Sequence, residues 1–149
     1  MLEINKVVAH FRDGRLLKGS TQNFLPNRPV FHLQPANRSA AVEVRTEQLK
    51  ALFFVKDLAG DPRRRDLRGF LAAPGEATHG KKIAVRFVDG ELLCGYSLAY
   101  QPGRGGFFVF PADAASNNLR IYVVATATQD VKSGPAADAL VQRLLARAA

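Results

Sequence analysis

The sequence has little of what crosslinks a chain or binds a metal: it contains one cysteine, three histidines and no tryptophan. A single cysteine, Cys94, excludes an internal disulfide and any zinc site built from several cysteines. The histidines, His10, His32 and His79, are scattered along the chain. We therefore expect no metal site and no cofactor.

Long apolar runs are absent as well. No stretch approaches the roughly 18 apolar residues that a membrane span needs. The first five residues, from Met1 to Asn5, do not combine a basic region with an apolar run, so they do not resemble a secretory signal. The sequence therefore predicts a cytoplasmic protein without a membrane span.

Acidic residues are in short supply. The chain has 21 Lys and Arg residues against 13 Asp and Glu, which gives a formal net charge of +8 and an isoelectric point near 10.2. Such a charge favours anionic partners such as nucleic acid, nucleotides or an anionic membrane surface, although a soluble basic protein without such a partner would have the same composition. With 47% apolar and 23% charged residues, the chain has the composition of a globular protein.

What the sequence does contain is an internal repeat. The segment FRDGRLLKG at residues 11–19 returns as FVDGELLCG at residues 87–95, and the offset of 76 holds without a gap as far as Pro35 and Pro111. From Lys6 onward, 11 of the 30 aligned pairs are identical, which predicts two copies of one module. Modules of about 55 to 70 residues have marginal cores on their own, so we expect the copies to pack against each other or against the C-terminal tail.

Each copy begins with a predicted β-hairpin. Apolar residues alternate in residues 83–88 with the two-residue period of a strand. The Asp-Gly pair that follows favours a type I′ turn with both residues at positive φ. A glycine in the middle of the returning strand, 15–24 or 91–100, predicts a bulge or sharp bend. These turn and bend positions are Asp13, Gly14 and Gly19 in the first copy and Asp89, Gly90 and Gly95 in the second.

Three further strands are predicted in each copy, with a Pro-containing loop before the third strand. In the first copy, Thr46 can cap a single helical turn at 46–49. The predicted fold class is mainly all-β: two tandem five-stranded barrels of the SH3-like or Sm-like kind, related by internal duplication, plus a C-terminal α-helix. The further strands cover residues 30–33, 41–44 and 51–55, and then 107–110, 119–124 and 127–131.

The chain is therefore divided into a first small barrel at 1–56, a basic linker rich in Pro and Gly at 57–80, a second small barrel at 81–132 and an amphipathic helix at 133–149. An apolar stripe along the helix predicts packing on a barrel or, alternatively, contact with a second copy or another partner. The stripe consists of Leu140, Val141, Leu144, Leu145 and Ala148.

The glycine-bent hairpin resembles the first signature of Sm-like proteins over residues 7–55 and 83–131. That resemblance implies five-stranded barrels that assemble into rings and bind RNA. The family holds a base with an acid directly after an aromatic residue and an Asn a few residues on. Those places fall here on Leu25 and about Pro29, and on Gln101 and Gly105, so the base-reading pair is not matched.

Two further resemblances concern the linker and the tandem arrangement. Arg64 and Arg68 have the Arg-x-x-x-Arg spacing of PilZ domains, which implies binding of cyclic di-GMP, because two such arginines can chelate phosphate oxygens. The whole arrangement resembles a bacterial family of duplicated barrels that are sometimes appended to signalling proteins.

No acid, base and nucleophile set can be assembled, so we expect no enzyme and no catalytic residue. The chain is interpreted as a binding or regulatory module in bacterial signalling or macromolecular assembly, with an anionic ligand or a protein as its partner. Nucleic-acid binding and cyclic-dinucleotide sensing are the alternatives, and association of copies through the barrels or the helix stays open. The candidate anion contacts are Arg28 and Arg104, which occupy one equivalent loop position, and Arg63, Arg64, Arg65 and Arg68 of the linker.

Overall fold

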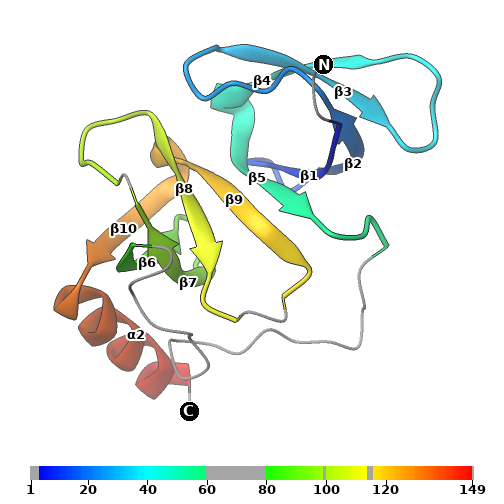
Figure 1. Ribbon diagram of the computed structural model, residues 1–149. Coiled ribbons are helices and arrows are strands. Elements are labelled where there is room, and N and C mark those ends of the chain that lie inside the picture. The colour runs from blue at the N-terminus through cyan, green and yellow to red at the C-terminus, as the bar shows by residue number, and fades with distance from the viewer. Residues whose placement is uncertain (1–3, 60–79, 99, 114–115, 149) are drawn as a thin grey trace.

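The chain forms ten antiparallel strands in one sheet and a C-terminal helix in a computed structural model that describes residues 4–59, 80–98, 100–113 and 116–148 (Figure 1). The strand order is β10-β6-β7-β8-β9-β5-β1-β2-β3-β4, which confirms a mainly β fold. The first half, residues 4–59, contains β1 (Asn5–Phe11), β2 (Leu16–Thr21), β3 (Val30–Pro35), β4 (Val42–Arg45), the 3-10 turn η1 (Thr46–Gln48) and β5 (Leu49–Val55). The second half, residues 80–134, contains β6 (Lys81–Phe87), β7 (Leu92–Ser97), β8 (Gly106–Pro111), β9 (Asn118–Val124), the 3-10 turn η2 (Ala125–Ala127) and β10 (Thr128–Ser133), and α2 (Pro135–Ala148) follows it.

The two halves share their hydrogen-bond registers as well as their sequence pattern. Val7 lies opposite Gly19 in the β1–β2 pair, and Ile83 lies opposite Gly95 in the β6–β7 pair, at the offset of 76. The β2–β3 and β7–β8 pairs coincide at the same offset. The sequence repeat therefore corresponds to a repeat of strand pairing.

The hairpin turn differs from the predicted type I′. Among the described residues no residue other than glycine has a positive φ, and in this turn only Gly14 does, with a φ of 94°. The N–H of Gly14 donates to the carbonyl of Phe11, and the N–H of Phe11 donates to the carbonyl of Arg15. The Asp13 carboxylate accepts the backbone N–H of Arg15 at 3.1 Å, which holds Asp13 in an ordinary conformation. The turn is thus of the three-residue kind, in which one left-handed glycine suffices.

The mid-strand glycines do not form the predicted bulge. The β1–β2 register runs unbroken past Gly19, and the β6–β7 register runs unbroken past Gly95. A Cβ atom on Gly19 would overlap the carbonyl oxygen of Gln34, and one on Gly95 would overlap that of Phe110. Glycine is needed there because the paired strand, β3 or β8, approaches the backbone too closely for a side chain. The returning strands are also shorter than predicted, since β2 and β7 have six residues each.

The single helical turn before β5 is confirmed as η1, but Thr46 does not cap it. Arg45 precedes η1 in an extended conformation, and no side chain caps the turn. The Thr46 hydroxyl instead donates to the carbonyl of Arg28 at 3.5 Å, and its N–H donates to the carbonyl of Pro29. This residue therefore ties the β2–β3 loop to η1.

Each half completes the apolar core of the other through the β5–β9 pair. Successive side chains of β5 face opposite cores, so that Leu52 and Phe54 lie in the core of the first half while Ala51 and Phe53 pack with that of the second. The first core comprises Val7, Ala9, Phe31, Leu33, Val44, Leu49, Leu52 and Phe54, together with Tyr122 and Val124 of β9. The second comprises Ile83, Val85, Phe87, Phe107, Val109, Ile121, Val123 and Ala127, together with Ala51 of β5.

The C-terminal helix packs within the chain, on the outer side of β6 and β10 (Figure 1). Leu140 and Val141 are buried there with Ala84 of β6, and the Lys82 ammonium lies 3.3 Å from the Asp138 carboxylate. Of the two outcomes that the sequence left open for the apolar stripe, the structure shows packing on the second half.

Candidate functional site

The meeting of β5 and β9 creates a cluster of aromatic rings shared by both halves. Phe24 lies at the centre, with ring centroids 5.1 Å from Tyr122, 5.9 Å from Phe54 and 6.4 Å from Phe108. Most of these contacts are edge-to-face, the arrangement that the ring quadrupoles favour. We call these rings and Phe31 the junction cluster.

Arg120 of β9 covers one side of the junction cluster. Its guanidinium carbon lies 4.5 Å from the centre of the Phe54 ring and 5.0 Å from that of Phe108. Within the described residues Arg120 has no carboxylate partner and no hydrogen bond. A guanidinium that packs against aromatic rings keeps its N–H donors available to an acceptor. Arginines use these donors to bind carboxylates and phosphates.

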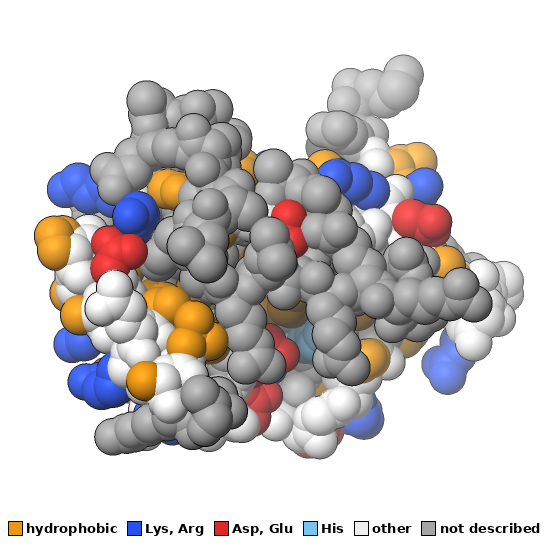
Figure 2. Space-filling view, turned by 90° about the horizontal axis from the view of Figure 1, so that it is seen from below, with side chains coloured by type: hydrophobic (Ala, Val, Ile, Leu, Met, Phe, Trp, Pro, Cys, Tyr) orange, Lys and Arg blue, Asp and Glu red, His pale blue; other side chains and the backbone are white. Residues whose placement is uncertain are grey.

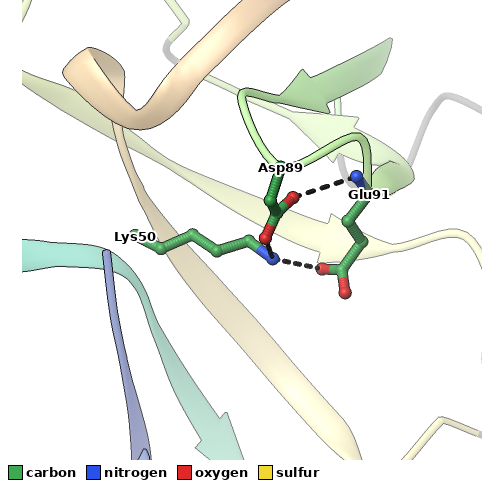
Figure 3. A network of polar contacts seen from close by, with 3 residues as sticks. All are labelled: Lys50, Asp89 and Glu91. Carbon is green, nitrogen blue, oxygen red and sulfur yellow. Dashed lines mark hydrogen bonds and ion pairs between the residues drawn. The ribbon is translucent and has the colours of Figure 1, made fainter. Parts of the chain in front are cut away.

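A second contact between the halves is electrostatic (Figure 3). The ammonium of Lys50, a buried residue of β5, lies 2.7 Å from the Asp89 carboxylate and 3.2 Å from that of Glu91, both in the hairpin of the second half. It also lies 4.6 Å from the centre of the Phe87 ring. The hydrogen bond from Lys50, with help from the backbone N–H of Glu91, lowers the pKa of Asp89. Since the one cation of this network is held by two carboxylates, the network joins the halves and does not offer a cationic group to an anionic ligand.

The hairpin of the first half makes a comparable contact with the second. The Arg12 guanidinium donates to the hydroxyl of Thr126 at 3.3 Å and to its carbonyl at 3.2 Å. Thr126 belongs to η2, so each hairpin reaches an element of the other half. The junction therefore extends beyond the β5–β9 hydrogen bonds.

His10 lies beside this junction, on β1. Its ring centroid is 4.2 Å from that of Phe53, and burial, reinforced by the positive charge of Lys50, lowers the pKa of His10 to about 4. On the face seen in Figure 2, most Lys and Arg side chains lie around the rim. His10 is thus neutral at neutral pH and serves packing.

Acidification should weaken the fold through His10. In the unfolded chain this histidine titrates near its ordinary pKa of 6.5, above the folded value of about 4, so the unfolded state binds more protons between those values. The stabilisation is fully present above pH 6.5 and is lost as the pH falls toward 4. Urea unfolding at several pH values should show this decline, and His10→Gln should remove most of it; an unchanged slope in the variant would contradict the assignment.

The predicted loop arginines lie in matching turns of the two halves. Arg28 follows Leu25 in the β2–β3 loop and Arg104 follows Leu98 in the β7–β8 loop, and both arginines are exposed. Neither has an ion pair or a side-chain hydrogen bond with a described residue, so the interpretation of an arginine bracing its own loop gains no support. The linker arginines, Arg63, Arg64, Arg65 and Arg68, lie outside the described residues.

Exposed leucines accompany these arginines. Leu25 is 46% exposed and Leu98 is 70% exposed, each in the same loop as its arginine. Leu119 is 53% exposed and directly precedes Arg120 on β9, where successive side chains point to opposite faces of the strand. We call these combinations the three leucine–arginine pairs. The sequence analysis did not single out the pair at Arg120. The signal that could have found it is the difference between the fourth strands of the two halves, because β9 is apolar where β4 is polar.

In the part of the chain that the structure describes, no three His, Cys, Asp or Glu side chains lie together as metal ligands would. Cys94 is half-buried and packs beside α2. Over the same residues, no helix has both the length and the apolar character needed to cross a membrane.

These features define a class of mainly β protein. Its two halves have the same strand pairing, and they are joined by the β5–β9 pair, where an arginine packs on a cluster of aromatic rings. The chain belongs to the family described as "Family of unknown function (DUF6982)", whose match covers residues 3–133, that is, both halves up to the end of β10. No curated protein and no solved structure shows significant similarity to the chain.

Proposed function

We propose that the two halves are two copies of one small barrel-like module and that together they act as a non-enzymatic binding module. The coincident registers at an offset of 76 support the first part. The core of the first half supports the curled form, because it draws buried residues from four of its strands and a partly buried one, Leu17, from β2.

The partner is an acidic protein segment that also carries apolar side chains. The observation that carries this proposal is that three arginines, each without a carboxylate partner among the described residues, have an exposed leucine in the same loop or next to them in the sequence. Carboxylates would pair with the guanidinium groups, and apolar side chains would cover the leucines. Arg120 is the strongest of the three, because Phe54 and Phe108 already restrain its side chain, so little conformational entropy is lost on binding.

The burial of the aromatic rings makes the nucleic-acid alternative weaker than the proposed protein partner. Binding of single-stranded nucleic acid uses aromatic faces on which bases stack. Phe54 and Tyr122 are buried in the junction cluster, and Arg120 covers Phe54, so these rings offer no free face. The base-holding positions of Sm-like proteins carry Leu25 and Gln101 here. Cyclic-dinucleotide sensing depends on Arg64 and Arg68, outside the described residues.

The test is a selection from a displayed library of random peptides, followed by fluorescence anisotropy with a selected peptide. Selected peptides should be enriched in Asp or Glu next to apolar residues. Leu25→Ser, Arg28→Gln and Arg120→Gln should each weaken binding by about tenfold if the side chain contacts the peptide, since a lost interface contact of this kind costs on the order of 1 to 2 kcal/mol.

Arg143→Gln is the matched control, because it removes one positive charge from an exposed residue of α2 and should leave the affinity unchanged. A single-stranded RNA probe is measured in parallel at about 50 mM and about 200 mM salt. Tight RNA binding that falls steeply with salt, without enrichment of acidic peptides, would support the nucleic-acid alternative and contradict the proposal.

A further inference from the structure

The sheet ends in two edge strands that are copies of the strands at its centre. No described residue pairs with the outer edge of β4 or of β10. β4 is the first-half equivalent of β9, and β10 is the second-half equivalent of β5. The β5–β9 pair therefore shows how one half joins another, and the same geometry would let β10 of one molecule join β4 of the next.

The outer face of β10 is charged where that of β5 is apolar. Alignment of the registers with β1 and β6 makes Asp130 the equivalent of Ala51 and Lys132 the equivalent of Phe53. Ala51 is fully buried in the core of the second half, and Phe53 packs against that core. Asp130 and Lys132 would occupy the same positions in the core of a neighbouring molecule.

The outer face of β4 is likewise polar where that of β9 is apolar. Glu43 is the equivalent of Tyr122 and Arg45 is the equivalent of Val124, by the registers with β3 and β8. Tyr122 and Val124 are almost fully buried in the core of the first half, whereas Glu43 and Arg45 are exposed. Likewise, His32 of β3 occupies the position that Phe108 of the junction cluster occupies in β8.

Pairing of β10 with β4 in the junction register would bury a carboxylate and a cation from each edge, and the desolvation of two ions can exceed their mutual attraction even where they pair with each other. Asp130 would lie opposite Val44, and Lys132 would lie opposite Val42. A charge transferred into an apolar core without an opposite charge is strongly disfavoured. Inward-pointing charges on edge strands are a known protection against edge-to-edge association.

The helix closes the β10 end further. At the junction, the outer face of β5 is covered by the second half, since Ala51 belongs to the core of that half. On the second half, the corresponding face is covered by α2, which contacts β6 and β10 and buries Ala84, the residue opposite Lys132. The helix thus lies where a further half would pack.

We propose that the chain is a single copy in solution, and that the charges on β4 and β10 prevent a second copy from joining the sheet. The resemblance to ring-forming Sm-like proteins would favour continued assembly through such edges, and these four residues oppose it. The proposal is independent of the acidic partner, which concerns the leucine–arginine pairs.

The test uses size-exclusion chromatography with light scattering on three full-length chains. The wild type should have the mass of one copy, 16.2 kDa, at every concentration. One variant makes the β4 edge resemble β9 (Glu43→Tyr with Arg45→Val). The other makes the β10 edge resemble β5 (Asp130→Ala with Lys132→Phe) and also carries Leu140→Glu, which releases α2 from the face where a further half would pack. Each variant keeps one charged edge and should stay at one copy, whereas their mixture should form a one-to-one dimer.

Two results would overturn the proposal. One is a wild-type chain with the mass of two or more copies. The other is a mixture that stays at one copy although circular dichroism shows both variants folded. If either variant fails to fold, the wild-type mass across the concentration range decides the question alone.

Discussion

Gly95→Ala is expected to destabilise the protein by about 3 kcal/mol or more, at the upper end of what overpacking costs. The added methyl group would overlap the carbonyl oxygen of Phe110 and lie 2.6 Å from Cγ1 of Val109. A carbonyl oxygen in a paired strand cannot move aside as a flexible side chain can. Since total stabilities of small proteins are about 5 to 15 kcal/mol, much of the protein would unfold under mild conditions. Urea unfolding followed by circular dichroism measures the loss, and Gly19→Ala should behave alike.

Gly105→Ala is the control for this prediction. Gly105 has no positive φ, and nothing lies within 4 Å of a Cβ atom built on it, so the substitution should change stability by a few tenths of a kcal/mol at most. Equal effects at Gly95 and Gly105 would show that close strand crossing is not what requires glycine at position 95.

Tyr122→Ala is expected to cost about 3 to 5 kcal/mol, as aromatic-to-alanine changes in cores do. Tyr122 belongs to β9 of the second half, but its ring packs in the core of the first half, 5.1 Å from that of Phe24 and 5.2 Å from that of Phe108. The cavity would therefore destabilise the half that does not contain the residue. Urea unfolding gives the magnitude.

Tyr122→Phe separates the ring from the hydroxyl. No hydrogen bond of this hydroxyl is seen among the described residues, and burial raises the pKa of Tyr122. The phenylalanine variant keeps the packing and should lie within about 1 kcal/mol of the wild type. A large loss in this variant would assign the effect to the hydroxyl and contradict the packing argument.

Much of the local structure could be predicted from the sequence, because hairpins and single strands depend on nearby residues. The alternation in residues 83–88 and the Asp-Gly pairs place β6 and both turns. The type of turn could not be predicted from the dipeptide alone, since the Asp13 side chain accepts the N–H of Arg15 and so stabilises a conformation without positive φ. The sequence singles out Gly19 and Gly95 as special positions. What requires glycine there is the close approach of the paired strand, β3 or β8, which only the fold reveals.

The junction and its site could not be predicted from one copy read alone. Residues 51–55 of β5 are all apolar, as a strand covered on both faces is, yet nothing local shows that the partner of β5 is β9. The positions of Arg120 and Lys50 depend on that pairing. The pairing is indicated only by differences between the two copies. Glu43 of β4 is polar where its equivalent, Tyr122 of β9, is apolar, and such differences mark which of the two strands is buried between the halves.

The central claim is that the two halves form one cooperative body, because each completes the other's core. Hydrogen exchange of backbone amides in Tyr122→Ala, compared with the wild type, tests it most directly. The claim predicts that the free energy of opening falls by the same amount for β1 and β2 of the first half as for β6 and β7 of the second half. Faster exchange confined to the first half, with β6 and β7 unchanged, would contradict it.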